Sequence, residues 1–177
     1  MTPVWRNEAG GLTVHDRAAD RFVKISPPGA PDLTAEAARL RWVRHVAPDL
    51  PVPVVVNAGA DDAGSWLVTR ALPGRSAVDP WCRARPAVAA AAIGSGLRRL
   101  HDTLPVDRCP FDWSAAARVR RVPDAAGQDP RRWHADHREV PAAAAVAAVR
   151  RPPPVDRAVV CHGDACAPNT LVGAGGT

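Results

Sequence analysis

The stretch VVCHGDACAPNT, residues 159–170, decides how the chain is interpreted. Two valines precede a His-Gly-Asp sequence, and an asparagine follows the aspartate five positions later. A phosphoryl-transfer enzyme needs a carboxylate that orients or deprotonates the attacking hydroxyl, and an amide oxygen that helps to hold the metal on the phosphates. Asp164 and Asn169 supply both groups. We expect them to converge on a tight loop after a buried strand formed by the valines.

An Asx-type turn is the alternative for the same two residues, with their side chains satisfying only local backbone groups. A bare Asp-x-x-x-x-Asn pattern favours that alternative. The His-Gly sequence before Asp164, the proline Pro168 before Asn169, and the preceding valines favour the phosphoryl-transfer interpretation.

The N-terminal part of the chain has the pattern of a small sheet. The segments at 12–16 and 21–26 alternate between apolar and polar residues and predict a β-hairpin. Two further strands are predicted at 50–59 and 65–72, joined by a turn at 61–64. The Leu-Pro-Gly sequence at 72–74 marks the expected lobe boundary.

A charged pair is predicted between this sheet and the helix that follows it. Lys24, the only lysine in the chain, lies on the second strand of the hairpin. Asp32 is expected to cap a helix that ends at residue 46, and Glu36 falls on the buried stripe of that helix. A carboxylate facing a core needs a partner. Spacing alone leaves both Lys24 and Arg39 open as that partner.

The remainder of the chain is predicted to be mainly helical. Apolar residues recur at helical spacing over 86–104, and 141–150 is a second helical segment. A compact Cys-Pro-Phe-Asp-Trp turn occupies 109–113, and 122–139 is polar and rich in loops.

Composition narrows the class of protein. The chain has 177 residues, of which 46% are hydrophobic, so it is too apolar for a disordered protein. No run of 18 apolar residues could span a membrane, and the first residues do not have the pattern of a secretory signal. Irregularly spaced cysteines favour a reduced, cytoplasmic setting over a disulfide framework.

The net charge of +5 permits binding to nucleic acid, but other features do not favour it. The arginines are scattered, as expected for solvated helix faces. A nucleic-acid-binding module would need aromatic platforms among its basic residues, whereas the six tryptophans are dispersed. We therefore expect neither nucleic acid nor a membrane as a partner.

The loop at 159–170 fits two other chemistries, a zinc site and a cysteine nucleophile, less well. Cys161, His162 and Cys166 do not match a common zinc-binding spacing, and a fourth ligand is not evident. Cys166 as a nucleophile would need a base, for which His162 on the same short loop is poorly placed.

The loop VVCHGDACAPNTLV resembles the catalytic loop of the aminoglycoside 3′-phosphotransferase family, whose members are relatives of the protein kinases. The resemblance covers nearly the whole chain, and the combination of HGDAC with CPFDWS is specific. The other matching segments follow in the family's order: VWRNEAGGLTV, RFVKIS, AEAARLRWV, GSWLVTRALPGRSAVDP and LRRLHD.

The resemblance implies an α+β, protein-kinase-like bilobal fold. Residues 1–71 would form the nucleotide-binding lobe, a small antiparallel sheet with one helix. Residues 72–177 would form part of a mostly helical lobe that carries the catalytic loop. The implied activity is transfer of the γ-phosphate of ATP, with Mg²⁺, to a hydroxyl of an aminoglycoside antibiotic, which confers resistance.

The resemblance also implies roles for individual residues. Lys24 would contact the nucleotide phosphates and pair with Glu36, His162 would brace the loop, and the backbone of the lobe hinge would meet the adenine. Asp164 is expected to face the substrate hydroxyl. The remaining implied positions are the hinge residues Thr69 and Ala71 and the magnesium ligand Asn169.

Substrate recognition is expected to involve acidic residues, because aminoglycosides are polycations. The segment 123–139 lies where the family's substrate loop falls, and Asp124 and Glu139 are our candidates within it. The alternative, that the acids of this segment only balance its arginines, is left open by the sequence.

Two features of the family are expected to lie outside the chain. We expect the first strand and the phosphate-covering loop upstream of the VWRN match, and a second, magnesium-binding aspartate downstream of Thr177. Residues 1–177 would then be the middle of such an enzyme. An inactive remnant or a nucleotide-binding pseudoenzyme of the same family is the alternative.

Overall fold

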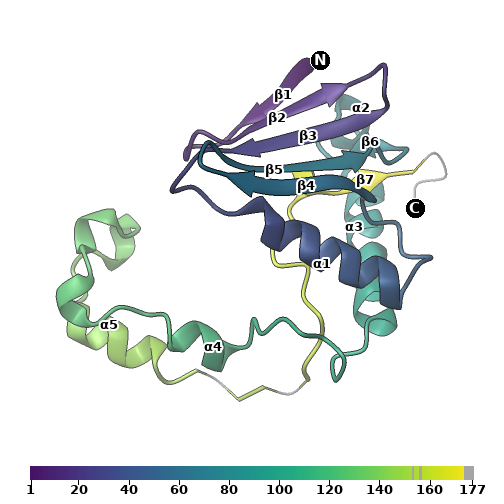
Figure 1. Cartoon of the computed structure of the whole chain (residues 1–177). Coiled ribbons are helices and arrows are strands. Elements are labelled where there is room, and N and C mark those ends of the chain that lie inside the picture. Colours follow the sequence, from purple (N-terminus) through teal and green to yellow (C-terminus); the bar gives the residue numbers. More distant parts are fainter. Residues whose placement is uncertain (153, 156, 174–177) are drawn as a thin grey trace. The chain divides into compact units, whose positions relative to one another are not determined.

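The computed structural model describes residues 1–152, 154–155 and 157–173. The chain divides into two compact units, one containing Met1–Pro105 and the chain from Val160 onward, the other containing Val106–Val159. All strands belong to the first unit, and the elements of each unit are labelled in Figure 1. Within the first unit, the segment after residue 71 packs with the end of the chain, where β6 pairs with β7.

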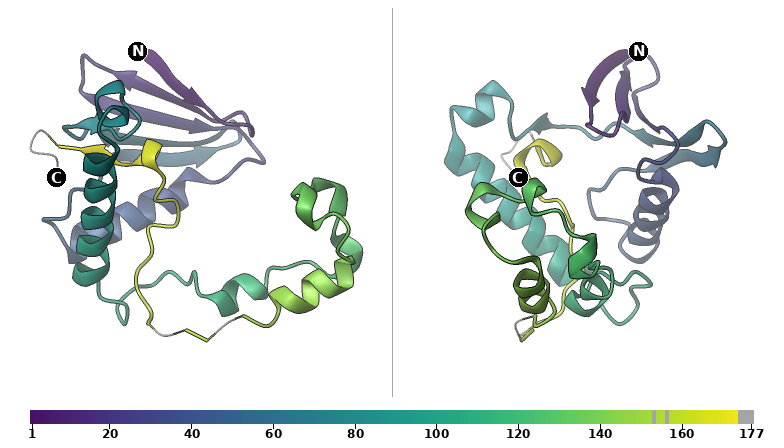
Figure 2. Two further views of the ribbon diagram at one scale, coloured as in Figure 1. Left: turned by 180° about the vertical axis from the view of Figure 1, so that it is seen from behind. Right: turned by 90° about the vertical axis from the view of Figure 1, so that its left-hand side faces the viewer.

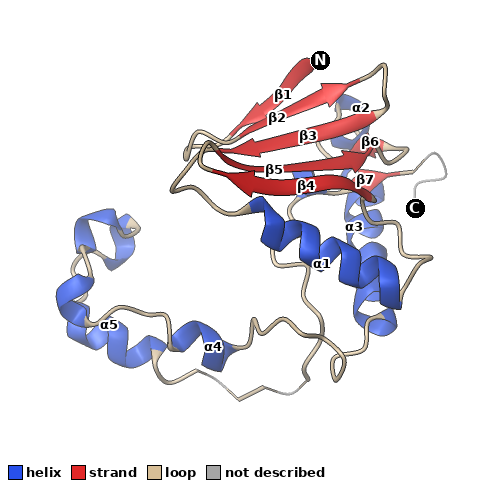
Figure 3. Ribbon diagram, viewed as in Figure 1, coloured by secondary structure: helices blue, strands red, loops and turns tan. Residues whose placement is uncertain are grey.

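A five-stranded antiparallel sheet forms the first part of the larger unit (Figure 3). Its spatial order is β1-β2-β3-β5-β4, so that only β4 and β5 depart from the order along the chain. The strands are β1 (Thr2–Arg6), β2 (Leu12–Asp16), β3 (Arg21–Ser26), β4 (Val55–Asp61) and β5 (Gly64–Arg70).

Strand β1 was not predicted from the sequence. All five of its residues are exposed, and its sequence, TPVWR, does not alternate between apolar and polar residues. A β-bulge between Pro3 and Trp5 interrupts its pairing with β2. The sheet therefore includes a strand before the hairpin, and the turn at 7–11 joins β1 to β2.

The predicted hairpin is confirmed as β2 and β3. Thr13 pairs with Lys24 and Val14 with Val23, so the register is continuous over the whole hairpin. Val14 is buried, which fixes one face of β2 against slippage.

The second predicted strand pair is also present, but β4 begins later than expected. Pro51 and Pro53 have no N–H to donate to a ladder, and the strand starts only at Val55. Gly64 opens β5 with φ of +126°, and a Cβ there would lie 2.1 Å from the carbonyl oxygen of Ser26. Only glycine fits this turn.

The predicted helix is confirmed as α1 (Leu33–Val46), which lies against β4 and β5 (Figure 1). Asp32 caps it by accepting a hydrogen bond from the Thr34 backbone N–H. Ala37 of the helix and Leu67 of β5 are both fully buried. Their burial places one side of α1 firmly on the sheet.

After the sheet come β6 (Arg75–Ser76), α2 (Pro80–Arg83) and α3 (Pro86–Thr103). Helix α3 was predicted, whereas α2 is too short to give a periodic pattern. The short strand β7 (Leu171–Val172) pairs with β6, and Figure 2 shows it returning beside α3. A buried cluster fixes this arrangement: Ala77, Cys82, Ala89, Ala92 and Val172.

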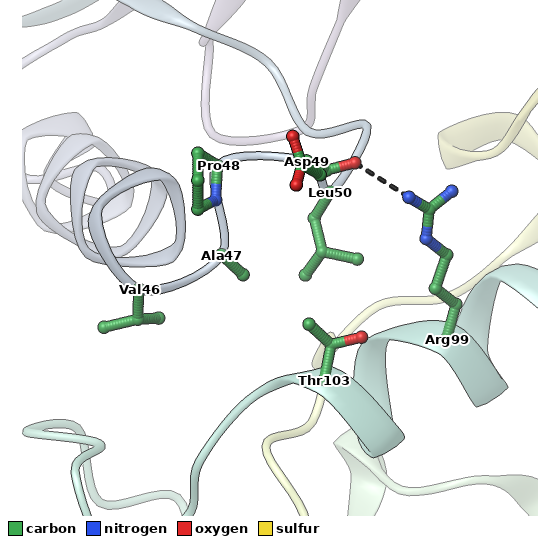
Figure 4. A pocket seen from close by; sticks show the side chains of 7 residues that line it. All are labelled: Val46, Ala47, Pro48, Asp49, Leu50, Arg99 and Thr103. Carbon is green, nitrogen blue, oxygen red and sulfur yellow. Dashed lines mark hydrogen bonds between the residues drawn. The ribbon is translucent and has the colours of Figure 1, made fainter.

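A second buried cluster joins the end of α1 to the end of α3. Ala47, Leu50 and Leu104 form its centre, and Val160 packs against it. Next to this cluster, the Arg99 guanidinium donates a hydrogen bond to the carbonyl oxygen of Asp49 across 2.9 Å. The same residues line a groove of about 250 Å³ (Figure 4).

The expected buried strand before the catalytic loop is wrong. Residues 158–161 have no strand conformation, and Val159 and Val160 are half-buried. Val160 contributes its side chain to the second cluster instead of extending a sheet. A short apolar run fits a packed loop as well as a strand, so sequence alone does not separate the two.

The smaller unit contains α4 (Ala115–Val119), the predicted helix as α5 (Ala142–Val149), and three single turns of 3₁₀ helix between them. These turns are Ala125–Gly127, Pro130–Arg132 and Ala135–His137. Within the described ranges of both units, no helix is long and apolar enough to cross a membrane.

Candidate functional site

Lys24 and Glu36 form an ion pair between β3 and α1. The Lys24 Nζ lies 2.6 Å from Glu36 Oε1 and donates a hydrogen bond to it. The two residues are brought together because α1 crosses the face of the sheet to which Lys24 points. Of the two partners that spacing left open for Glu36, the structure places Lys24 in contact.

The pair is more exposed than the sequence indicated. The side chains are 42% and 40% exposed, whereas we expected Glu36 to face the core. Glu36 lies in the first turn of α1, at the rim of the contact with the sheet, and the fully buried residue is its neighbour Ala37. An ion pair this accessible contributes about 0–1 kcal/mol to stability.

Asp164 and Asn169 converge as predicted. Asn169 donates from Nδ2 to Asp164 Oδ2 across 2.8 Å, and the same nitrogen lies 3.2 Å from the Asp164 carbonyl oxygen. Both residues are exposed. Because both residues are exposed, the carboxylate oxygens of Asp164 and the amide oxygen of Asn169 are accessible to a ligand.

The loop around this pair is held by its own backbone. Gly163 has φ of +87°, which turns the chain immediately before Asp164. The Asp164 N–H donates to Nδ1 of His162, in agreement with a bracing role for that histidine. The Cys166 carbonyl accepts from the N–H of Asn169, which closes the single turn η4 (Ala167–Asn169).

The catalytic loop is anchored to the segment that follows the sheet. Ala77 donates its N–H to the carbonyl of Thr170 across 2.9 Å, next to the β6–β7 pair. Gly74 lies so close to β7 that a Cβ would be 3.0 Å from the Val172 carbonyl oxygen. The loop that carries Asn169 is therefore held by contacts with the segment 74–77, which includes β6.

The hinge residues lie at the end of β5. Thr69 is buried and pairs with Phe22 on one side and Val55 on the other. The Ala71 N–H donates to the carbonyl of Asp20 across 2.9 Å. In this conformation the Ala71 donor that we assigned to adenine is engaged within the protein.

Two features near Lys24 were missed by sequence analysis. The turn between β1 and β2 is closed by Asn7, whose Oδ1 accepts from the Gly11 N–H across 2.6 Å. On the sheet face of Lys24, the ring of Phe22 stacks on that of His15, with centroids 4.4 Å apart. The Gly-Gly pair at 10–11 and the Phe-x-Lys alternation were the available signals.

The two candidate substrate residues belong to the smaller unit. Asp124 accepts a hydrogen bond from Arg150 across 2.7 Å, and Glu139 is exposed. Elsewhere in the same segment, hydrogen bonds from Arg131 lower the pKa of Asp129. At least part of the acidic charge here balances arginines, as the alternative interpretation expected.

The chemistry of the catalytic loop fits a magnesium ion better than a transition metal. Carboxylate and amide oxygens are the hard ligands that Mg²⁺ prefers, usually with substrate phosphates completing its shell. Within the described residues, no three His, Cys, Asp or Glu side chains gather closely enough to hold a metal. The side-chain oxygen of Asn169 could therefore hold a magnesium ion beside the phosphates of a bound nucleotide, with the Asp164 carboxylate next to it.

Together these features define a protein-kinase-like phosphotransferase fold. Its marks are a lysine on the third strand, paired with a glutamate on the helix that follows, and a catalytic-loop aspartate with an asparagine five residues later. The chain belongs to the phosphotransferase enzyme family, whose model matches residues 9–177.

Two similar curated proteins are phosphotransferases by name, in agreement with this family assignment. The chain is 36% identical to an aminoglycoside 3′-phosphotransferase of Streptomyces fradiae, over 87% of the chain and 59% of the relative. It is 38% identical to that of Streptomyces ribosidificus, over 91% and 62%. The chain thus spans about three fifths of the length of these relatives.

A solved structure shares the fold. The crystal structure of an aminoglycoside 3′-phosphotransferase of type VIII superimposes with a TM-score of 0.75 and 34% sequence identity. The match covers 96% of this chain and 64% of that one. The bilobal, kinase-like fold predicted from the sequence is therefore confirmed for the part of the fold that this chain spans.

Proposed function

We propose that the chain is the nucleotide-binding and catalytic-loop part of an ATP-dependent aminoglycoside O-phosphotransferase. The observation that carries the proposal is the 2.8 Å contact between Asn169 and Asp164. It brings together, on one exposed loop, a carboxylate that could accept the proton of a hydroxyl and an amide whose oxygen could bind a metal ion. The names of the relatives supply the substrate class, aminoglycosides.

Lys24 is the proposed contact for the nucleotide phosphates. Glu36 holds the ammonium group through the 2.6 Å contact and prevents it from folding back on the sheet. The turn at 7–11 joins the first two strands, where protein kinases have the loop that covers the phosphates. The glycines of this turn allow its backbone to approach a phosphate closely.

The end of β5 is the proposed site for the adenine. Phe22 lies opposite Thr69 in the ladder and offers an aromatic surface to the base. The backbone of Thr69 and Ala71 would meet the base edge. For Ala71 to donate to adenine, its N–H must exchange the Asp20 carbonyl for the nucleotide.

Asp164 is the proposed catalytic residue. Its carboxylate orients the aminoglycoside hydroxyl and accepts its proton as the hydroxyl oxygen bonds to the γ-phosphorus of ATP; the bond from that phosphorus to the bridging oxygen breaks, and ADP leaves. Asn169 would hold Mg²⁺ through its side-chain oxygen, since its Nδ2 is directed to Asp164. When bound, Mg²⁺ neutralises charge on the phosphates. In this proposal Asp124 and Glu139 attract the cationic substrate, and the reaction takes place in the cytoplasm, where ATP is abundant.

The test combines a binding and a transfer assay. The purified chain is titrated with a fluorescent ATP analogue and Mg²⁺, and is then incubated with Mg·ATP and single aminoglycosides such as kanamycin or streptomycin. We expect nucleotide binding and a monophosphorylated drug detected by mass spectrometry. Binding without transfer would support the pseudoenzyme alternative, and the absence of both would contradict the proposal.

A further inference from the structure

Two buried serines lie beside the Lys24–Glu36 pair without taking part in it. Ser26 is 4% exposed and Ser65 is 7% exposed, and they face each other across the β3–β5 ladder. Serine is seldom buried this deeply unless its hydroxyl is bonded. Both hydroxyls bond the chain that leads into α1.

Each serine makes a different contact with that segment. Ser26 donates its hydroxyl to the carbonyl of Pro31 across 2.7 Å. Ser65 Oγ accepts from the backbone N–H of Leu33, the first residue of α1, across 3.0 Å. The first four N–H groups of a helix have no partner within it, so Ser65 satisfies one of these donors.

The two serines hold the first turn of α1, the turn that carries Glu36. Leu33 lies three residues before Glu36, within one helical turn, and Ser26 lies two residues after Lys24 on the same strand. A shift of the first turn of α1 would move Glu36 away from Lys24, because the helix is rigid over so short a distance. The half-exposed ion pair is too weak to hold α1 by itself.

We propose that Ser26 and Ser65 are positioning residues that hold the first turn of α1, and with it Glu36, in register with Lys24. The inference deepens the proposed function and rests on it, because the pair serves catalysis only if Lys24 binds nucleotide phosphates. The serines would act through the helix, because both hydroxyls bond the segment at the start of α1.

The sequence offers a direct probe, because Lys24 is the only lysine. Reductive methylation of the folded chain modifies the Lys24 amine and the N-terminal amine. Peptide mass spectrometry gives both rates, and the N-terminal amine serves as internal reference. A lysine held by a carboxylate reacts more slowly than a released one, and Glu36→Gln sets the rate of the released state.

Ser65→Ala is expected to raise the relative methylation rate of Lys24 about two- to fivefold, the ratio that an accessible ion pair supports. Ser26→Ala should act in the same direction, and Ser65→Thr, which keeps the hydroxyl, should restore the slow rate. Ser95→Ala is the matched control, because its hydroxyl bonds the Ala92 carbonyl within α3. Its rate should equal that of the wild type.

A second variant removes the same bond from the helix side. Leu33→Pro eliminates the donor while proline remains favourable at the first helical position. It should raise the Lys24 rate as Ser65→Ala does, and combining the two should add nothing further. A wild-type rate in folded Ser65→Ala and in Leu33→Pro would overturn the inference. Failure of the wild-type chain to bind Mg·ATP would instead contradict the proposed function and leave the labelling result intact.

Discussion

Asn169 and Asp164 are joined by a 2.8 Å hydrogen bond, so the proposed metal ligand and the proposed base share one loop. The contact constrains both side chains before any nucleotide binds. Because the two groups have different tasks, their substitutions should have different kinetic consequences, which makes the assignment testable residue by residue.

Asp164→Asn should preserve the fold and nucleotide binding while lowering transfer about a hundred- to ten-thousandfold. Asparagine keeps the shape but loses the charge that accepts the hydroxyl proton. The measurements are kcat by product formation and Kd for the ATP analogue. A variant that keeps wild-type kcat would show that Asp164 is not the base.

Asn169→Ala should instead weaken magnesium and ATP use together. The loop retains Asp164, so the loss is expected in the magnesium concentration needed for half-maximal nucleotide binding, with a smaller fall in kcat at saturating metal. Titration with Mg²⁺ at fixed nucleotide measures it. An unchanged magnesium dependence would remove Asn169 from the metal site.

Substitutions of the two acidic candidates in the smaller unit, Glu139 and Asp124, should change the KM for the aminoglycoside by different amounts. Glu139→Ala is expected to raise the KM for the aminoglycoside with little effect on kcat, through the loss of a negative charge near the cation. Asp124→Ala should have a smaller effect, because Arg150 already neutralises that carboxylate. If neither change alters KM, these acids do not contact the substrate.

The parts of the fold that depend on local pattern were predictable from the sequence. Helices α1 and α3 were found from their apolar spacing, and α1 also from its cap. The convergence of Asp164 and Asn169 was predictable because the two lie on one short loop. Each of these features needs only residues that are neighbours in the chain.

Features that join distant segments were not predictable in the same way. Spacing left Lys24 and Arg39 equal as partners of Glu36, because the choice depends on how α1 packs on the sheet. The sequence of strand β1, TPVWR, does not alternate between apolar and polar residues, so its pairing with β2 could not be predicted from local pattern. The anchor of the catalytic loop, from Ala77 to Thr170, joins residues far apart in sequence.

The turn before β5 gives a prediction about stability. Gly64→Ala should lower the free energy of unfolding by about 1–3 kcal/mol, because the residue has φ of +126° and the new Cβ would press on the Ser26 carbonyl. Gly94→Ala, in α3 with nothing within 4 Å of its added Cβ, should raise it by about 0.5–1 kcal/mol. Urea unfolding of both variants distinguishes local strain from a general intolerance of substitution.

The cap of α1 predicts how stability changes with pH. The Thr34 hydroxyl and then the Thr34 backbone N–H donate to the carboxylate of Asp32, and these hydrogen bonds lower its pKa from the ordinary value of 3.8. A lowered pKa in the folded state means that the unfolded chain binds the proton more readily. The stabilisation is therefore fully present above about pH 4 and is lost as the pH falls through the lower, folded-state pKa.

Asp32→Asn isolates this contribution, because asparagine also caps helices but does not titrate. We expect the wild type to be more stable than Asp32→Asn at pH 6, and the difference in unfolding free energy to shrink as the pH is lowered toward 3. Other acids with lowered pKa, Asp112 and Asp129, are common to both proteins and cancel in the comparison. Thr34→Val removes the donor with the larger effect and should flatten the pH dependence. Parallel stability curves for wild type and Asp32→Asn would show that the cap carries no charge-dependent stabilisation of the helix that holds Glu36.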